Sequence, residues 1–295
     1  VKTVTGAEGV TITQVAIYQG PERVLALNGV RQPTSTVPLV AGRDAFVRVF
    51  YTATAAVIGR PVTGRLELDG HEPIESSATL AIASDGAKLA TTVNFKVPSE
   101  MMTSELVYRV SVLALAAKDN DGAHHPLSGF EQHAIEGPHN TLRVVVLPFR
   151  YDFDGSGRVP DTSPAAIDKL RTRLLQLYPV SDVQITVGDI VPWNKELTPT
   201  GGGWQDALDA VYLLGLSSNV PQDVYHYGMF NPLPTYSDWC KGSCRNGLAI
   251  LNHGPLGLGA AQLRFAIGVG YVQTAADTMA HEIGHSHGRR HANCG

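Results

Sequence analysis

The chain has 295 residues, of which 43% are hydrophobic and 17% are charged. This is the composition of a folded globular protein, and it excludes bulk disorder. A formal net charge of -4 gives no reason to expect a nucleic acid or an anionic membrane as partner. No apolar run reaches the roughly 20 residues that a membrane-spanning helix needs. The length is large for a single hydrophobic core and predicts two domains.

The N-terminal part of the chain predicts a series of short strands. Apolar and polar residues alternate over 62–69, 93–97 and 106–112, and this period of two is typical of strands with one buried face. Three further strand candidates are 10–18, 45–52 and 80–82. Turn dipeptides such as Asn28-Gly29 separate the strands. Many short strands at this spacing predict an all-β sandwich of the immunoglobulin-like type.

The composition changes between residues 117 and 140, where polar and turn-forming residues dominate. Such a stretch is typical of a domain boundary. We therefore predict a multidomain protein, with a β-sandwich domain and its linker over residues 1–138 and a second domain over residues 139–295.

Strand and helix patterns alternate in the second domain, which predicts an α/β fold. Residues 142–149 are almost all apolar, as expected for a strand that is covered on both faces. Ser163 and Pro164 are typical of the N-cap and the first position of a helix. An apolar stripe at helical spacing begins at Trp204, and Gly215 directly after it predicts the end of that helix. Further strands are predicted at 183–187, 224–230 and 248–251.

The last predicted helix has a start signal, an end signal and an apolar side. Thr274 is followed three residues later by Asp277, which resembles a capping box. Gly288 accepts the left-handed backbone conformation that ends many helices. Met279 and Ile283 fall on one side of this helix and are expected to anchor it in the core.

The other side of this helix carries a cluster of histidines. His281 and His285 are four residues apart, so their side chains share one face. The glycine that ends the helix lets the chain turn back, and this turn can bring His291 to the same place. Three neutral imidazoles suit Zn²⁺ and leave its fourth position for water. Glu282 is adjacent to this face, within reach of such a water as a general base.

The residues from 281 to 291 match the pattern His-Glu-x-x-His-x-x-Gly-x-x-His and so resemble the metzincin superfamily of zinc endopeptidases. The resemblance implies an α/β zincin catalytic domain. It also implies that His281, His285 and His291 bind one catalytic Zn²⁺. Glu282 would then be the general base that activates a zinc-bound water to hydrolyse a peptide bond. A β-sandwich before such a domain loosely resembles the layout of some bacterial secreted metalloproteases, including mucin-directed ones.

The end of the chain departs from the metzincin pattern. Metzincins have a methionine turn beneath the metal, downstream of the third histidine, and only four residues follow His291 here. The lower subdomain, which shapes the pocket for the residue after the scissile bond, is missing as well. We therefore expect a processed or truncated fragment that ends just after the third zinc ligand. Its C-terminal remainder would then be a partner, and would contain the cysteine that pairs with Cys294.

Cys240 and Cys244 are the candidates for a disulfide, because they lie only four residues apart. The alternative is a second metal site at these two thiols, but no further Cys or His stands nearby at ligand spacing. A near pair with one leftover cysteine favours a secreted or cell-surface protein with few disulfides.

Three further features of the second domain bear on the site. Residues 152–157 resemble a calcium-binding loop but lack the third acidic position and the terminal glutamate of an EF-hand, so a strand-to-helix loop is favoured and Ca²⁺ is the alternative. His287 lies about 200° around the helix from His285 and is expected to point away from the metal. The segments 248–253 and 265–273 are candidates for pairing with an extended substrate by β-addition.

The remaining histidines show no spacing that is typical of a site. His71, His124 and His125 lie in turn-rich stretches and are expected at the surface. His226 and His253 lie in the second domain and could approach the cleft, although nothing in their spacing requires it.

Taken together, these patterns predict a secreted zinc-dependent endopeptidase that acts on a protein or glycoprotein substrate. The alternative is a catalytically inactive, zinc-containing binding or adhesin-like protein. Metal analysis combined with a cleavage assay on the wild type and Glu282→Ala separates the two.

Overall fold

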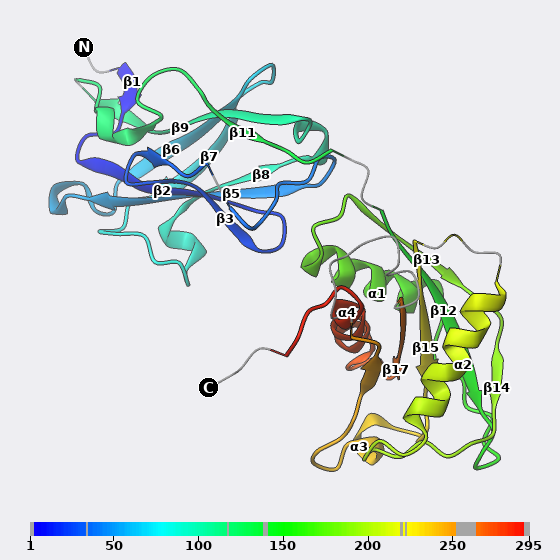
Figure 1. The fold of residues 1–295 in the computed structure, drawn as a ribbon. Helices are drawn as coiled ribbons and strands as arrows, with labels where there is room; N and C mark the ends of the chain where they lie inside the picture. The colour runs from blue at the N-terminus through cyan, green and yellow to red at the C-terminus, as the bar shows by residue number, and fades with distance from the viewer. Residues whose placement is uncertain are drawn as a thin grey trace. The chain divides into compact units, whose positions relative to one another are not determined.

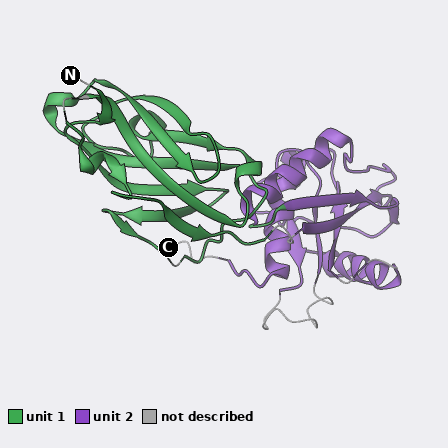
Figure 2. Ribbon diagram, turned by 90° about the horizontal axis from the view of Figure 1, so that it is seen from above, with its two compact units in different colours: residues 1–140, 179–181 green, residues 141–178, 182–295 purple. Residues whose placement is uncertain are grey.

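The computed structural model describes residues 3–33, 35–116, 118–137, 141–218, 221, 223–251 and 264–291. The chain divides into two compact units (Figure 2). One contains residues 1–140 with 179–181, and the other contains residues 141–178 with 182–295. Each unit has a hydrophobic core of its own.

The N-terminal unit is built from antiparallel strands (Figure 1). The strands are β1 (Thr3–Gly6), β2 (Val10–Tyr18), β3 (Glu22–Leu27), β4 (Val30–Arg31), β5 (Ala45–Ala53), β6 (Pro61–Leu68), β7 (Ile74–Thr79), β8 (Val93–Val97), β9 (Glu105–Ala116), β10 (His124–His125) and β11 (Glu131–Ala134). Short 3-10 helices are η1 (Ala55–Val57), η2 (Leu89–Thr91), η3 (Ser99–Met101) and η4 (Asp121–Ala123). One sheet has the order β1-β9-β6-β7, with β10 and β11 also paired to β9, and the other has the order β4-β3-β2-β5-β8.

Residues from both sheets form one shared core, which makes this unit a β-sandwich and confirms the prediction at that level. Leu66 of β6 and Phe95 of β8 are buried, whereas Lys96, the next residue of β8, is exposed. The period of two in the sequence therefore marks the inward-facing side chains. A Cβ atom at Gly64 would clash with the side chain of Val93, so the missing side chain lets the sheets approach.

Two predictions for this unit were wrong. Residues 80–82 are not a strand, and the strand in this region is β7, which lies at the edge of its sheet and alternates only between half-buried and exposed positions. His125 is buried rather than at the surface, and its Nε2 lies 3.2 Å from Glu131 Oε2. The side chain of His124 is also largely covered, whereas His71 is exposed as predicted.

The C-terminal unit contains a mixed sheet and helices. Its strands are β12 (Thr141–Tyr151), β13 (Asp182–Val187), β14 (Val191–Trp193), β15 (Val224–Phe230), β16 (Gly247–Ala249) and β17 (Phe265–Val269). Its helices are α1 (Pro164–Leu177), α2 (Trp204–Ser217), α3 (Tyr236–Trp239) and α4 (Ala275–Ser286). The strand order is β13-β12-β15-β17-β16, with β14 also paired to β12. The pairings are parallel except for that of β16 with β17, which is antiparallel.

Helices cover both faces of this sheet (Figure 1). A Cβ atom at Gly228 of β15 would lie 2.6 Å from Val211 of α2. One at Gly268 of β17 would lie 2.7 Å from Thr278 of α4. Gly228 is paired with Ile267, and successive residues of a strand point to opposite faces. Helices α2 and α4 therefore lie on opposite faces of the sheet, and α1 packs beside α4.

The predicted start of α1 is confirmed, and the predicted end of α2 is wrong. The Ser163 side chain accepts a hydrogen bond of 3.4 Å from Ala166 N, as an N-cap does. Helix α2 runs through Gly215 and ends at Ser217. A Cβ atom at Gly215 would clash with the Phe265 ring, so this glycine serves the packing of α2 on the sheet rather than the end of the helix.

The predicted disulfide between Cys240 and Cys244 is confirmed, with their Cα atoms 5.2 Å apart. It closes the loop between α3 and β16. Because both sulfur atoms are bonded to each other, these residues do not form the second metal site that was the alternative.

We expect the double substitution Cys240→Ser with Cys244→Ser to lower the free energy of unfolding by about 2 kcal/mol, because the open loop gains conformational entropy in the unfolded chain. Denaturant unfolding measures this change. The matched control is Ser243→Ala, an exposed position in the same loop that leaves the disulfide intact. An unfolding midpoint equal to that of the control would contradict the expectation.

Candidate metal centre

Helix α4 is anchored by its apolar side. Met279 and Ile283 are fully buried, as their spacing predicts. Thr274 precedes the first helical residue, but its side chain makes no capping hydrogen bond. Its Oγ1 instead lies 3.0 Å from Thr278 Oγ1, one turn into the helix. The predicted position of the helix start is therefore confirmed, whereas the predicted capping box is wrong.

The end of α4 turns the chain back toward the helix. Gly288 has a φ of 79°, in the left-handed region that glycine adopts without strain. Gly288 N donates to His285 O at 2.8 Å, and Arg289 N donates to Gly284 O at 2.9 Å. These two hydrogen bonds form a Schellman motif, which satisfies carbonyls of the last helical turn. The reversal brings the residues after Gly288 to the histidine face of the helix.

Three histidine side chains meet on that face. His291 Nε2 lies 3.0 Å from His281 Nε2 and 3.1 Å from His285 Nε2. In a tetrahedral zinc site with Zn–N bonds of about 2.0–2.1 Å, neighbouring nitrogens lie about 3.3 Å apart. The three side chains therefore already stand near the spacing of ligands around one small cation, and the group could hold a metal ion.

The surroundings of the imidazoles favour this role. His285 Nδ1 lies 2.6 Å from Arg289 O, so a proton on Nδ1 is hydrogen-bonded and Nε2 keeps its lone pair for a metal. Burial lowers the pKa of His281, and the neighbouring His285 and His291 lower it further. The neutral form that a metal requires is thereby favoured at this position.

Glu282 is buried next to the histidine face, and only 6% of its surface is exposed. Burial raises the pKa of its carboxyl to about 8, against an opposing effect of the Arg245 charge. The carboxylate packs on the backbone of β16, because a Cβ atom at Gly247 would clash with its Oε1. Glu282 is not one of the three converging ligands. Its predicted role as a base requires that it is not a ligand.

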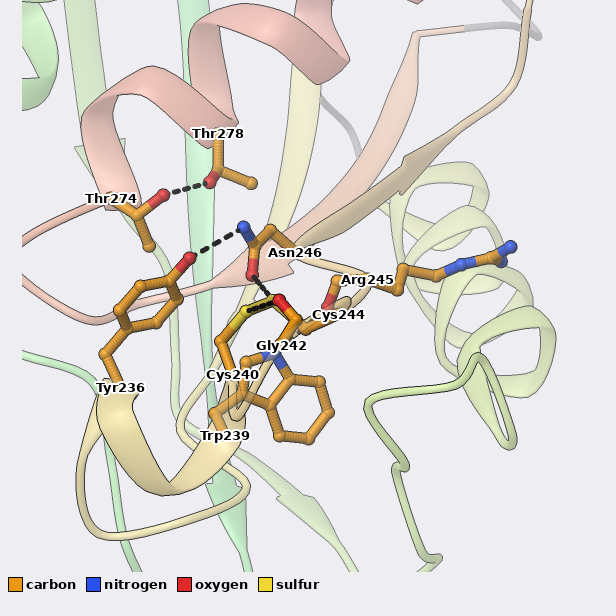
Figure 3. Close-up of a disulfide and its surroundings, with 9 residues drawn as sticks. All are labelled: Tyr236, Trp239, Cys240, Gly242, Cys244, Arg245, Asn246, Thr274 and Thr278. Atoms are coloured by element: carbon orange, nitrogen blue, oxygen red, sulfur yellow. Dashed lines mark hydrogen bonds between the residues drawn. A yellow bond between two sulfur atoms is a disulfide. The ribbon is translucent and has the colours of Figure 1, made fainter.

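The loop before β16 is fixed in place by the disulfide and by hydrogen bonds (Figure 3). Trp239 Nε1 donates to Arg245 O at 3.0 Å, and Asn246 Nδ2 donates to Tyr236 Oη at 3.1 Å. Figure 3 also shows the Arg245 side chain pointing away from the disulfide. The residue that follows this loop is Gly247, so the loop determines where the Glu282 carboxylate meets the sheet.

Two other histidines of this unit point away from the metal face. His287 Nε2 lies 3.0 Å from Tyr225 Oη and its Nδ1 lies 2.9 Å from Ile283 O, which confirms the prediction. The His226 ring stacks on Phe265, on the α2 face of the sheet. His226 therefore does not approach the triad.

The loop at 152–157 has arginine partners for its carboxylates. Arg150 Nε donates to Asp152 at 3.0 Å, and Arg158 pairs with Asp154. Within the described residues, the three histidines are the only group whose ligand atoms converge as a metal site requires. The loop interpretation is therefore favoured over calcium.

Parts of several predictions lie outside the described residues. They are His253, the end of the substrate-pairing candidate 248–253, and Cys294. In the described part of the chain, no helix is both long and apolar enough to cross a membrane.

Comparison with known proteins does not identify a family: no protein-family model matches this sequence, and no curated protein matches it significantly.

Three residues around Glu282 were not predicted from the sequence, namely Gly247, Gly268 and Tyr227. Small residues alternate with larger ones over β17, with Ala266 and Gly268 on the α4 face. This alternation was a usable signal that a helix packs closely there. The cross-strand partner of Gly268 could not be predicted, because this partner, Gly247, lies 21 positions away in the sequence.

We expect the wild type to bind one equivalent of zinc and His281→Ala, His285→Ala or His291→Ala to bind it at least about 100-fold more weakly, since losing a ligand costs more than losing a hydrogen bond behind one. Calorimetric titration of the metal-free protein measures the affinity. His71→Ala, at an exposed position in the other unit, is the control. Equal affinity in all four variants would show that the triad is not the site.

Proposed function

We propose that the C-terminal unit is a zinc endopeptidase of the metzincin type, an α/β zincin domain that follows an immunoglobulin-like sandwich. The observation that carries the proposal is the convergence of the Nε2 atoms of His281, His285 and His291, with Glu282 next in the chain and buried beside them. Three imidazoles that leave one position open are the donor set of a catalytic zinc, whereas structural sites use four protein ligands. Helices on both faces of a largely parallel sheet support the α/β class.

The chemistry follows from the donor set and the adjacent carboxylate. Zinc, when bound, supplies a Lewis acid that lowers the pKa of water to about 7 and polarises the scissile carbonyl. Glu282 takes a proton from the water as it attacks the peptide carbonyl, and then passes that proton to the leaving amine. The reaction is hydrolysis of a peptide bond, and the substrate class is protein or glycoprotein.

Strand β16 is the better of the two candidates for binding an extended substrate. In the described part of the sheet, β17 is paired on both sides, whereas β16 ends the strand order. Val269 N donates to Asn246 O, and Ile250 N donates to Phe265 O. Since successive residues of a strand turn their backbone groups to opposite sides, the N–H and C=O of Ala249 face away from β17. A peptide could add to this side by β-augmentation.

We also propose that the protein works outside the reducing cytosol, secreted or at the cell surface. The support is the disulfide between Cys240 and Cys244, because disulfides persist mainly in oxidising compartments.

The direct test of the function is Glu282→Gln, with Glu282→Ala as a second variant. We expect kcat on casein or mucin to fall by about 10²–10⁴-fold, as is usual when a general base is lost. Zinc content, measured by mass spectrometry, should stay at one equivalent. Activity of the wild type should also disappear with a chelator and return with zinc.

The same assay separates the enzyme from the alternative function. If zinc is bound but the wild type and both variants are equally inert, the endopeptidase is excluded for this chain and a zinc-containing binding or adhesin-like protein remains.

The edge-strand interpretation predicts a selective effect of Ala249→Pro, which removes the N–H that faces the free edge and spares the ladder to β17. We expect kcat/KM to fall about 3- to 10-fold, the worth of one backbone hydrogen bond. Ala249→Ser keeps the N–H and is the control. Equal kcat/KM for the two variants would argue against substrate pairing at β16.

A further inference from the structure

The α4 face of the sheet carries two tyrosines of β15 with different surroundings. Tyr225 Oη lies 3.0 Å from His287 Nε2, so its hydroxyl is hydrogen-bonded. Tyr178, which follows α1, donates to Ala280 O at 2.6 Å and is anchored as well. The hydroxyl of Tyr227 is fully buried, and no hydrogen-bond partner for it is found among the described residues. A buried hydroxyl without a partner is unfavourable, and such groups are rare unless they serve a function.

A pair of glycines places this hydroxyl next to Glu282. Gly247 of β16 and Gly268 of β17 are direct partners across the two strands. Direct partners point to the same face, with Cβ positions about 4.5–5.5 Å apart. A Cβ atom at Gly247 would clash with Glu282 Oε1, and one at Gly268 would clash with Tyr227 Oη. The carboxylate and the hydroxyl therefore occupy neighbouring places above this glycine pair.

The electrostatics agree with this placement. Burial raises the pKa of the Tyr227 hydroxyl well above its ordinary value, and the negative charge of Glu282 raises it further. The two groups therefore lie within the same buried region, and the hydroxyl keeps its proton. A protonated hydroxyl can donate a hydrogen bond to a carboxylate, and such a bond is stronger than one between neutral groups.

We propose that Tyr227 is a positioning residue for Glu282, and that its hydroxyl donates a hydrogen bond to the Glu282 carboxylate in the working site. The inference rests on the proposed role of Glu282 as general base. The glycine pair leaves open the space through which the two side chains approach each other. The hydrogen bond fixes the rotamer of a glutamate that no other described polar side chain is seen to fix. Tyr227 acts through Glu282 and touches neither the substrate nor the metal.

The test is Tyr227→Phe, with Tyr225→Phe as the matched control. Both remove one hydroxyl from the same strand and face, but only the first removes the one beside Glu282. For Tyr227→Phe we expect kcat to fall about 10- to 100-fold, the range seen when a group that orients an active-site residue is lost. KM and zinc affinity should stay within about twofold of the wild type, since the hydroxyl contacts neither partner. Tyr225→Phe should keep the wild-type kcat.

Two further measurements separate positioning from a structural role. In the Glu282→Gln background, Tyr227→Phe should cause no additional loss of activity, because the residue it acts through is already altered. A crystal structure of the zinc-loaded protein should show the Tyr227 hydroxyl about 2.5–2.7 Å from a Glu282 carboxylate oxygen. An oxygen–oxygen distance beyond about 3.5 Å, or a wild-type kcat for Tyr227→Phe, would overturn the inference.

Failure of the inference differs from failure of the proposed function. If the zinc-loaded wild type is inert, the endopeptidase itself fails, and the positioning role fails with it. If the wild type cleaves and depends on Glu282 while Tyr227→Phe is fully active, the function stands and only the role of Tyr227 is lost.

Discussion

Close packing of helix α4 against strands β16 and β17, which turn only glycine and alanine toward it, is the constraint on which the candidate site depends. On this face β16 and β17 present the pair Gly247 and Gly268, and the next pair is Ala249 and Ala266. Side chains of ordinary size would hold the helix away from the sheet. Because they are missing, Glu282 enters the helix–sheet interface, while the histidines on the neighbouring face of the same helix stay accessible at the surface.

The three histidines of the triad are positioned in two different ways. Within the helix, the four-residue spacing places His281 and His285 on one face without any help from the rest of the fold. His291 depends on the reversal at Gly288, where two backbone hydrogen bonds of the Schellman motif fix the path of the chain. The carbonyl of Arg289 in this turn also contacts His285 Nδ1. The turn thus both supplies the third imidazole and orients the second.

How much of the fold the sequence predicts depends on how far apart in the sequence the interacting residues lie. Local signals worked: the strand alternation around Leu66 and the cap at Ser163 correspond to elements in the structure. The predicted end of α2 at Gly215 was wrong because a glycine inside a helix and a glycine after a helix look alike in sequence. Only the close contact of Gly215 with the Phe265 ring distinguishes the two cases. Strand β7 escaped prediction because its inner positions are only half-buried, so they need not be apolar and the sequence shows no clear alternation of apolar and polar residues.

For the site, the sequence predicted which side chains converge but not what lies beneath them. The pattern from His281 to His291 is short, so the geometry of one helix and of the turn after it determines which side chains converge. The setting of Glu282 depends on the register between β16 and β17, which joins residues about 20 positions apart, and no local pattern specifies that register. For the same reason Tyr227 reads in sequence as one more residue of a regular strand.

The central claim is that three imidazole nitrogens hold one metal ion and leave a position open beside Glu282. X-ray absorption spectroscopy of the zinc-loaded protein tests it most directly. We expect four light-atom neighbours of the zinc at about 2.0–2.1 Å, with the scattering pattern of three imidazoles. A sulfur neighbour at about 2.3 Å, or fewer than three imidazoles, would contradict it.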